Sequence, residues 1–295
     1  MSSRDGRGFW DEVVDLHSLI LGWYESRNLF HKIGFLIADG ASSFSGLIKR
    51  SRDRSKSAFE ADLDGLIRDS LRLSEADLRE LGYQQDTKAA RALLLMNVET
   101  VRQRKHSSER YSFRQHAAGR WSLEHIHAQN AEPLNREEQW AEWLWLHRRA
   151  LMAFDGVDRA EKDAVLGRLD QVLASSALTE ADFRPLEREL TELLSGGADS
   201  SNGDVDSIAN LALLDGGDNS ALSNSVFAVK HAVILDRDRR GSYIPVCTRN
   251  VFLKYYSQAD EHQLHFWSAD DREYYLDALV ASLRDYLHAD EDGRS

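Results

Sequence analysis

The sequence has little cysteine, little proline and no long hydrophobic run. Its one cysteine, Cys247, excludes an internal disulfide and any zinc site that needs several cysteines. The three prolines, Pro133, Pro185 and Pro245, all occupy positions where a helix can begin. No apolar stretch is long enough to span a bilayer, and the first residues lack the charged-then-apolar pattern of a secretory signal. We therefore expect a cytoplasmic protein with no membrane partner.

Positive charge is scarce overall but locally concentrated. The chain has 37 Lys and Arg against 49 Asp and Glu, and this net charge of −12 argues mildly against nucleic-acid binding. Residues 101–123 nevertheless contain six bases and one acid, and residues 49–56 contain five bases and one acid. Acids outnumber bases thirteen to five in residues 155–206 and ten to three in residues 259–295. Basic segments on an acidic chain suit a DNA enzyme that must not bind DNA everywhere.

The spacing of apolar residues predicts a mostly helical protein. The expected helices cover 9–23, 30–37, 44–50, 57–72, 75–82, 87–105, 136–153, 158–175, 179–194, 218–233, 248–257 and 269–288. The best strand region is 110–127, and the segment that starts at Trp121 alternates apolar and polar residues before a loop.

Two distant stretches share the features of one small site. Residues 121–130 (WSLEHIHAQN) indicate the end of a strand that carries histidine, and residues 207–214 (SIANLALL) indicate a strand that runs into a turn. A helix that begins near Asp218 or Asn219 and carries Lys230 should follow. Strand, strand and helix is the order of elements in a ββα-metal nuclease site, so we expect such a motif embedded in the helical protein.

These segments resemble the C-terminal HNH-type (His-Me finger) nuclease domain of GmrSD-like restriction enzymes. That group contains modification-dependent and antiphage nucleases, including phosphorothioation-sensing effectors. The resemblance extends to Trp23-Tyr24 with residues 31–37 (HKIGFLI), which are similar to the helical connector of those proteins, and to residues 252–256 (FLKYY) followed by Trp267. The HNH domain of the CRISPR effector nuclease also has two asparagines nine residues apart, as Asn210 and Asn219 are here.

The resemblance implies a division into three parts. We expect a helical connector at 1–105, a nuclease core at 106–257 with a helical insertion at 133–206, and a C-terminal helix at 258–295 that packs on the core. It also implies that a longer protein would carry an N-terminal nucleotide-hydrolysing domain, which is not evident in this sequence.

The site residues suit phosphodiester hydrolysis. A histidine that is neutral near pH 7 accepts the proton of an attacking water, and His125 is the candidate base. Mg²⁺ or Mn²⁺ prefers hard oxygen ligands, which Glu124 and the side-chain carbonyl of Asn219 supply. Many HNH sites have Asp where this chain has Glu124, and Glu keeps the carboxylate on a longer arm. Asn210 is expected to hold the loop or to orient His125.

Basic residues near these motifs are candidates for DNA contact. Arg102, Arg104, Arg120 and Lys230 are expected to bind phosphates. The alternative for the arginines is pairing with the acidic helices of 155–206. His127 lies two residues after His125, which would place both on one face of a strand, so a phosphate contact and a structural role are equally plausible.

The sequence therefore favours a Mg²⁺- or Mn²⁺-dependent DNA endonuclease of restriction or antiphage defence, acting on phage or foreign DNA. One ββα site holds one strand, which favours nicking. Two alternatives stay open. One is a helical module that binds DNA or a partner and has an inactive nuclease site, and the other is an RNase.

Overall fold

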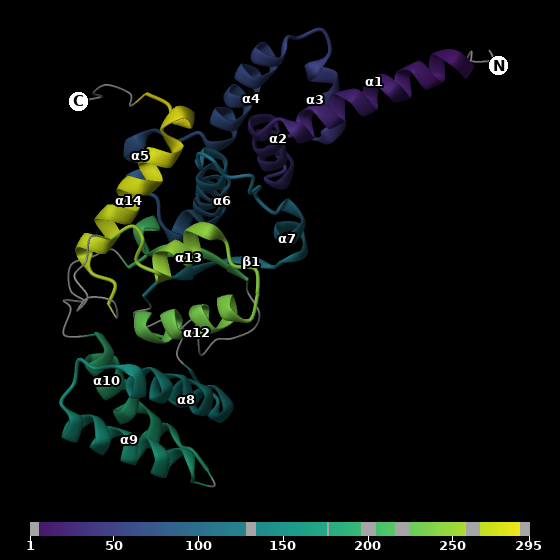
Figure 1. Cartoon of the computed structure of the whole chain (residues 1–295). Helices are drawn as coiled ribbons and strands as arrows, with labels where there is room; N and C mark the ends of the chain where they lie inside the picture. Colours follow the sequence, from purple (N-terminus) through teal and green to yellow (C-terminus); the bar gives the residue numbers. More distant parts are fainter. Residues whose placement is uncertain are drawn as a thin grey trace. The chain divides into compact units, whose positions relative to one another are not determined.

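The computed structural model describes residues 6–127, 134–175, 177–195, 205–215, 225–257 and 266–289. The chain forms two compact units. The first contains residues 1–75, 94–118 and 282–295, and the second contains residues 76–93 and 119–281. The expectation of a mostly helical protein with a small β-element is confirmed, because the described residues form many helices and one two-stranded sheet (Figure 1).

The described part of the first unit consists of helices, with one isolated β-bridge between Ser74 and His288. It contains α1 (Gly6–Glu25), α2 (Arg27–Ala38), α3 (Phe44–Ser51), α4 (Lys56–Leu71), the second half of α6 (Asp86–Gln103), α7 (Phe113–Ala118) and the 3-10 turn η4 (Arg284–Tyr286). Apolar residues four apart on α4, including Phe59, Leu63 and Ile67, are buried, as the helical period requires. Trp23 at the end of α1 stacks on Phe59, with 5.5 Å between ring centroids.

The strand predicted for residues 110–127 is wrong in its first half, where the structure has the helix α7. The ring of Phe113 lies against α2 at Gly34, and a Cβ on Gly34 would come within 2.1 Å of that ring. The close approach needs a glycine and fixes Phe113 at the start of a helix. The residue pattern within the segment gives no sign of this long-range contact.

The second unit surrounds the sheet with helices. Its helical elements are α5 (Glu75–Arg79), η1 (Tyr83–Gln85), the first half of α6, α8 (Glu137–Ala153), α9 (Arg159–Leu173), α10 (Glu180–Ser195), η2 (Ile208–Asn210), α12 (Phe227–Arg239), α13 (Val246–Phe252) and α14 (Ala269–Leu283). Helix α8 packs against α9 and α10, with Trp143, Leu169 and Phe183 buried. Of the prolines, Pro245 directly precedes α13 as predicted, whereas Pro185 lies inside α10, so the prediction for Pro185 is wrong.

The sheet pairs the two predicted motifs. Strand β1 (Trp121–His125) runs antiparallel to β2 (Leu211–Asp215), with Trp121 opposite Asp215 and His125 opposite Leu211. The first four residues of β2 are buried. Side-chain hydroxyls from the surrounding helices hold its outer carbonyls: the Thr248 hydroxyl donates to the Leu213 carbonyl at 2.6 Å, and Tyr275 donates to that of Leu211 at 3.1 Å.

The helix that carries Lys230 begins later than predicted. Val226 has an extended backbone (φ −66°, ψ 162°), and α12 starts at Phe227 instead of near residue 218 or 219. Asn219 therefore does not open this helix, and the position of Asn219 itself lies outside the described residues. In the described parts of the chain, no helix combines the length and the apolar character needed to cross a bilayer.

Candidate active site at the end of the two-stranded sheet

His125 is the last residue of β1 and has a partly open side chain. Its Nε2 lies 3.1 Å from Oδ1 of Asp206, and the side chains are 21% and 46% exposed respectively. The imidazole also stacks on the ring of Tyr83, with centroids 5.1 Å apart and an interplanar angle of 27°. In the neutral tautomer that donates from Nε2 to Asp206, Nδ1 keeps its lone pair. This arrangement leaves His125 able to accept a proton while Asp206 orients the ring.

Asp206 was not predicted, and its place depends on a distant turn. The Tyr83 N–H donates to the Asp206 carbonyl at 2.7 Å, and a Cβ on Gly82 would lie only 2.8 Å from that oxygen. Glycine at position 82 therefore permits the approach that sets Asp206 beside His125. The one signal in the sequence is an acid immediately before Ser207, where the second motif begins.

The Asn210 side chain forms hydrogen bonds with the backbone just after His125. Its Oδ1 accepts the His127 N–H at 3.1 Å, while its Nδ2 donates to the carbonyls of His127 and Val205 at 2.9 Å each. The Ile126 N–H also donates to the Asn210 carbonyl at 2.7 Å. The buried Asn210 side chain thus joins the end of β1 to the segment that carries Asp206, because Val205 directly precedes it.

His127 and His125 have different environments. Strand β1 ends at His125, so the expected common strand face does not extend to His127. The Nδ1 of His127 accepts the N–H of Phe227, the first residue of α12, at 3.3 Å. Burial, with contributions from the positive charges of Arg272 and Lys230, lowers the pKa of His127 to about 4. His127 is therefore neutral at pH 7 and serves as an acceptor at the start of α12.

Lys230 is buried beneath the sheet. Its ammonium donates to the backbone carbonyl of His125, and the residue is 2% exposed. Burial lowers its pKa to about 8, while the charge of Glu124 acts in the opposite direction. A side chain in this position fixes the backbone of His125 instead of reaching out to a phosphate.

Glu124 supplies a half-buried carboxylate on the opposite face of β1 from His125, because successive strand residues alternate. Its Oε1 accepts the Ser122 hydroxyl at 3.4 Å. Among the described residues, no group of three or more His, Cys, Asp or Glu side chains is arranged to hold a metal ion. A single carboxylate still fits Mg²⁺, which commonly uses one or two protein oxygens and completes its coordination shell with waters and phosphates.

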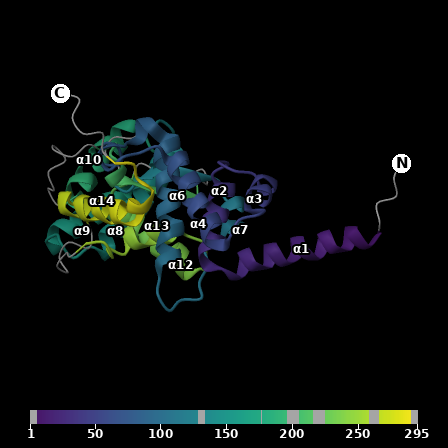
Figure 2. The same ribbon diagram turned by 90° about the horizontal axis from the view of Figure 1, so that it is seen from above.

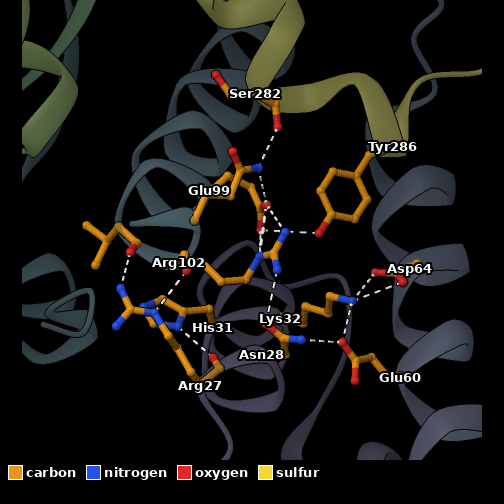
Figure 3. Close-up of polar contacts among 12 residues, drawn as sticks. Arg27, Asn28, His31, Lys32, Glu60, Asp64, Glu99, Arg102, Ser282 and Tyr286 are labelled. Carbon is orange, nitrogen blue, oxygen red and sulfur yellow. Dashed lines mark hydrogen bonds and ion pairs between the residues drawn. The ribbon is translucent and has the colours of Figure 1, made fainter. Parts of the chain in front are cut away.

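The three arginines predicted to bind DNA have different surroundings. In the first unit, Arg102 binds the carboxylate of Glu99 through Nε and Nη2 and donates from Nη1 to Oδ1 of Asn28 at 3.0 Å (Figure 3). Glu99 is 1% exposed, and although burial opposes it, the bonds to Glu99 raise the pKa of Arg102 above its usual value. The partner of Arg102 is thus a neighbour on α6 and not the acidic segment of residues 155–206.

Arg104 and Arg120 are more accessible. Arg104, also in the first unit, pairs with Glu109 near the surface. Arg120 belongs to the second unit and directly precedes β1, where its backbone N–H donates to Oδ1 of Asp215 at 3.2 Å. Its side chain is exposed, and no described residue pairs with its guanidinium group. Of the three arginines, Arg120 is therefore the one whose charge is available beside the sheet.

Comparison with known proteins identifies no relative: no family model, no curated protein and no solved structure matches this chain.

Proposed function

We propose that this chain is a Mg²⁺- or Mn²⁺-dependent DNA endonuclease that nicks one strand, built on an HNH-type ββα motif like that of GmrSD-like enzymes. In this proposal it acts in the bacterial cytoplasm against phage or foreign DNA. The observation that carries the proposal is the His125–Asp206 pair at the partly exposed end of β1. The geometry of this pair and the chemistry of its two side chains support the proposal.

The pair suits general-base catalysis. His125 Nδ1 takes the proton of a water that attacks the phosphorus, and Asp206 stabilises the imidazolium that forms. Tyr83 limits rotation of the imidazole by stacking on one side. Asn210 and Lys230 act as positioning residues, since Lys230 binds the backbone carbonyl of His125 and the Asn210 side chain binds the backbone N–H of His127. A base held at a fixed angle loses little entropy when substrate binds.

A hard divalent ion, when bound, would neutralise charge on the phosphate and the leaving oxygen. Glu124 and Asn219 are the residues proposed to hold it. For DNA contact we propose Arg120, with Arg104 and the basic segment 49–56 as further surfaces. Arg102 is left out of this set because its charge is paired inside the protein.

The test is relaxation of supercoiled plasmid by the purified chain with Mg²⁺ or Mn²⁺, with and without EDTA. We expect open-circle product that EDTA abolishes and that Glu124→Ala greatly reduces. A matched control is Glu142→Ala, an acid on the insertion helix α8. Product formed equally in EDTA would contradict the metal requirement, and cleavage of RNA but not of plasmid would favour an RNase.

A second candidate is a DNA-binding module with an inactive site. Lys230 favours it, because its positive charge interacts with the charge of Glu124 and would compete with a metal ion for that carboxylate. This candidate predicts retention of DNA on the protein in a gel-shift assay and no plasmid relaxation under any metal condition.

A further inference from the structure

Helix α1 exposes an extensive apolar surface. Seven of its large apolar side chains are between 39% and 66% exposed: Phe9, Trp10, Val13, Val14, Leu16, Leu21 and Tyr24. Every residue from Gly8 to Ser18 is exposed. Figure 2, like Figure 1, shows the first half of α1 standing away from α2, α3 and α4. Only the end of α1 is anchored, through the buried Trp23.

The exposed apolar residues form one continuous stripe. They recur at three- and four-residue steps, so at about 100° per residue they cover one side of the helix. The acids Asp11 and Glu12 flank the stripe, and Asp15 lies on the opposite side. A surface helix packed on its own domain would direct such a stripe inward, whereas this stripe faces solvent.

A helix with such an exposed apolar stripe is expected to pack against a partner surface. Isolated helices shorter than about 12–15 residues are marginal in water. The exposed half of α1 also contains the β-branched pair Val13 and Val14, which lowers helix propensity. Contiguous exposed apolar patches of several hundred Å² mark interaction sites.

We propose that α1 is a homodimer seam, in which the stripe of one copy packs antiparallel against the stripe of a second copy. Seven side chains that are about half exposed, with roughly 150–200 Å² each, offer on the order of 600 Å². Two such stripes together bury on the order of 1,200 Å², which reaches the size of specific interfaces. A symmetric dimer uses the same patch twice, and one uniform apolar stripe meets that requirement.

The distribution of charge along α1 favours an antiparallel orientation of the two helices. The first half of α1 carries Asp11, Glu12 and Asp15, with no base among the residues of α1 whose side chains are described. At the other end, the guanidinium of Arg110 lies over the ring of Tyr24, 4.6 Å from its centroid. An antiparallel pair brings Asp11 and Glu12, which flank the stripe, toward Arg110 of the other copy, whereas a parallel pair sets these two acids against the same two acids of the other copy. The two helix dipoles also oppose each other favourably.

The first experiment measures mass in solution. The chain has a mass of 33.5 kDa, and light scattering after gel filtration at tens of micromolar should give twice that value. The variant with Trp10→Glu, Val14→Glu and Leu21→Glu should be a monomer with an unchanged core, because all three side chains are exposed. The control with Asp11→Asn and Asp15→Asn should stay dimeric. A monomeric wild type, or a dimeric triple-Glu variant, overturns the proposal.

The second experiment tests whether the two α1 helices run antiparallel. In the antiparallel seam centred on His17, Val13 of one copy lies beside Leu21 of the other. A mixture of the Val13→Cys and Leu21→Cys chains should form a mixed disulfide under mild oxidation, since the native Cys247 is buried. A disulfide formed instead between two Val13→Cys chains, or no mixed product, overturns the antiparallel seam. Both experiments are independent of the proposed nuclease activity.

Discussion

Two groups of polar side chains in this molecule differ in how fully their charges are paired and buried. The first, a charge cluster in the first unit, comprises Arg27, Asn28, Lys32, Glu60, Asp64, Glu99, Arg102 and Tyr286 (Figure 3). There, Lys32 Nζ lies 3.1 Å from Glu60 and 2.7 Å from Asp64, and Tyr286 donates to Glu99 at 3.2 Å. The second is the His125–Asp206 pair of the second unit, which is partly open.

The two groups differ in whether their charged side chains are fully paired and shielded from solvent. Arg102 and Glu99 satisfy each other in a closed environment, so any change of charge there must disturb the fold. His125 has one described carboxylate partner, and its side chain is 21% exposed, so its ring is in contact with solvent. A group that performs acid–base chemistry needs the second condition.

The largest effect on folding is expected at the charge cluster. Arg102→Ala leaves the carboxylate of Glu99 buried without its cation, which typically costs about 3–5 kcal/mol. The free energy of unfolding from urea titration measures this loss. Arg104→Ala removes a surface pair and should cost less than about 1 kcal/mol. Equal losses in the two variants would contradict a closed cluster.

His127 should make the second unit sensitive to acid. Its folded pKa of about 4 lies below the ordinary 6.5, so the unfolded chain binds more protons between these values. Its contribution to stability is complete above pH 6.5 and is lost as pH falls toward 4, by about 3 kcal/mol in total. His127→Gln, which keeps an acceptor for the Phe227 N–H, should flatten the stability curve in this window, whereas the exposed control His288→Gln should not. An unchanged slope in His127→Gln would refute this assignment.

The sequence predicted much of the fold because helical periodicity is local. The helices expected at 44–50, 57–72, 87–105, 136–153, 158–175 and 179–194 match α3, α4, α6, α8, α9 and α10 to within two residues at each end. The pairing of residues 121–125 with 211–215 was also anticipated from their order. The division into three domains and the roles of the site residues stay predictions.

Three departures from the predictions involve contacts between distant residues. Residues 113–118 lie in the predicted strand region but form a helix, with Phe113 packed at Gly34. The start of α12 is set by His127, which lies one hundred residues before Phe227. Asp206 reaches His125 only because the turn at Gly82 binds its backbone. No periodicity within one segment reveals such contacts.

Asp206 should have a moderate effect on rate. Asp206→Asn keeps the shape but removes the charge that stabilises an imidazolium at His125, and partial exposure limits the loss to about tenfold to a hundredfold. Nicking rates at saturating metal measure this, with circular dichroism as a check on folding. Wild-type nicking rates in Asp206→Asn would show that the Asp206 charge has no role in the reaction.

Arg120 should have the smallest effect. Replacing one exposed phosphate contact with Arg120→Gln should weaken binding to all DNA sequences alike and reduce the slope of log affinity against log salt by about 0.9. The matched control is Arg159→Gln, whose side chain is 95% exposed at the start of α9. If both variants changed the slope equally, the effect would be one of net charge, not of a contact.

The most direct measurement compares the nicking rate and melting temperature of the wild type with those of His125→Ala. The account predicts a rate loss of about 10²–10⁴-fold, because a general base is removed. It predicts little change in melting temperature, because the side chain is partly exposed and its main partner, Asp206, is nearly half exposed. Metal-dependent nicking by His125→Ala at the wild-type rate would contradict the central claim that the open His125–Asp206 pair is the reactive centre.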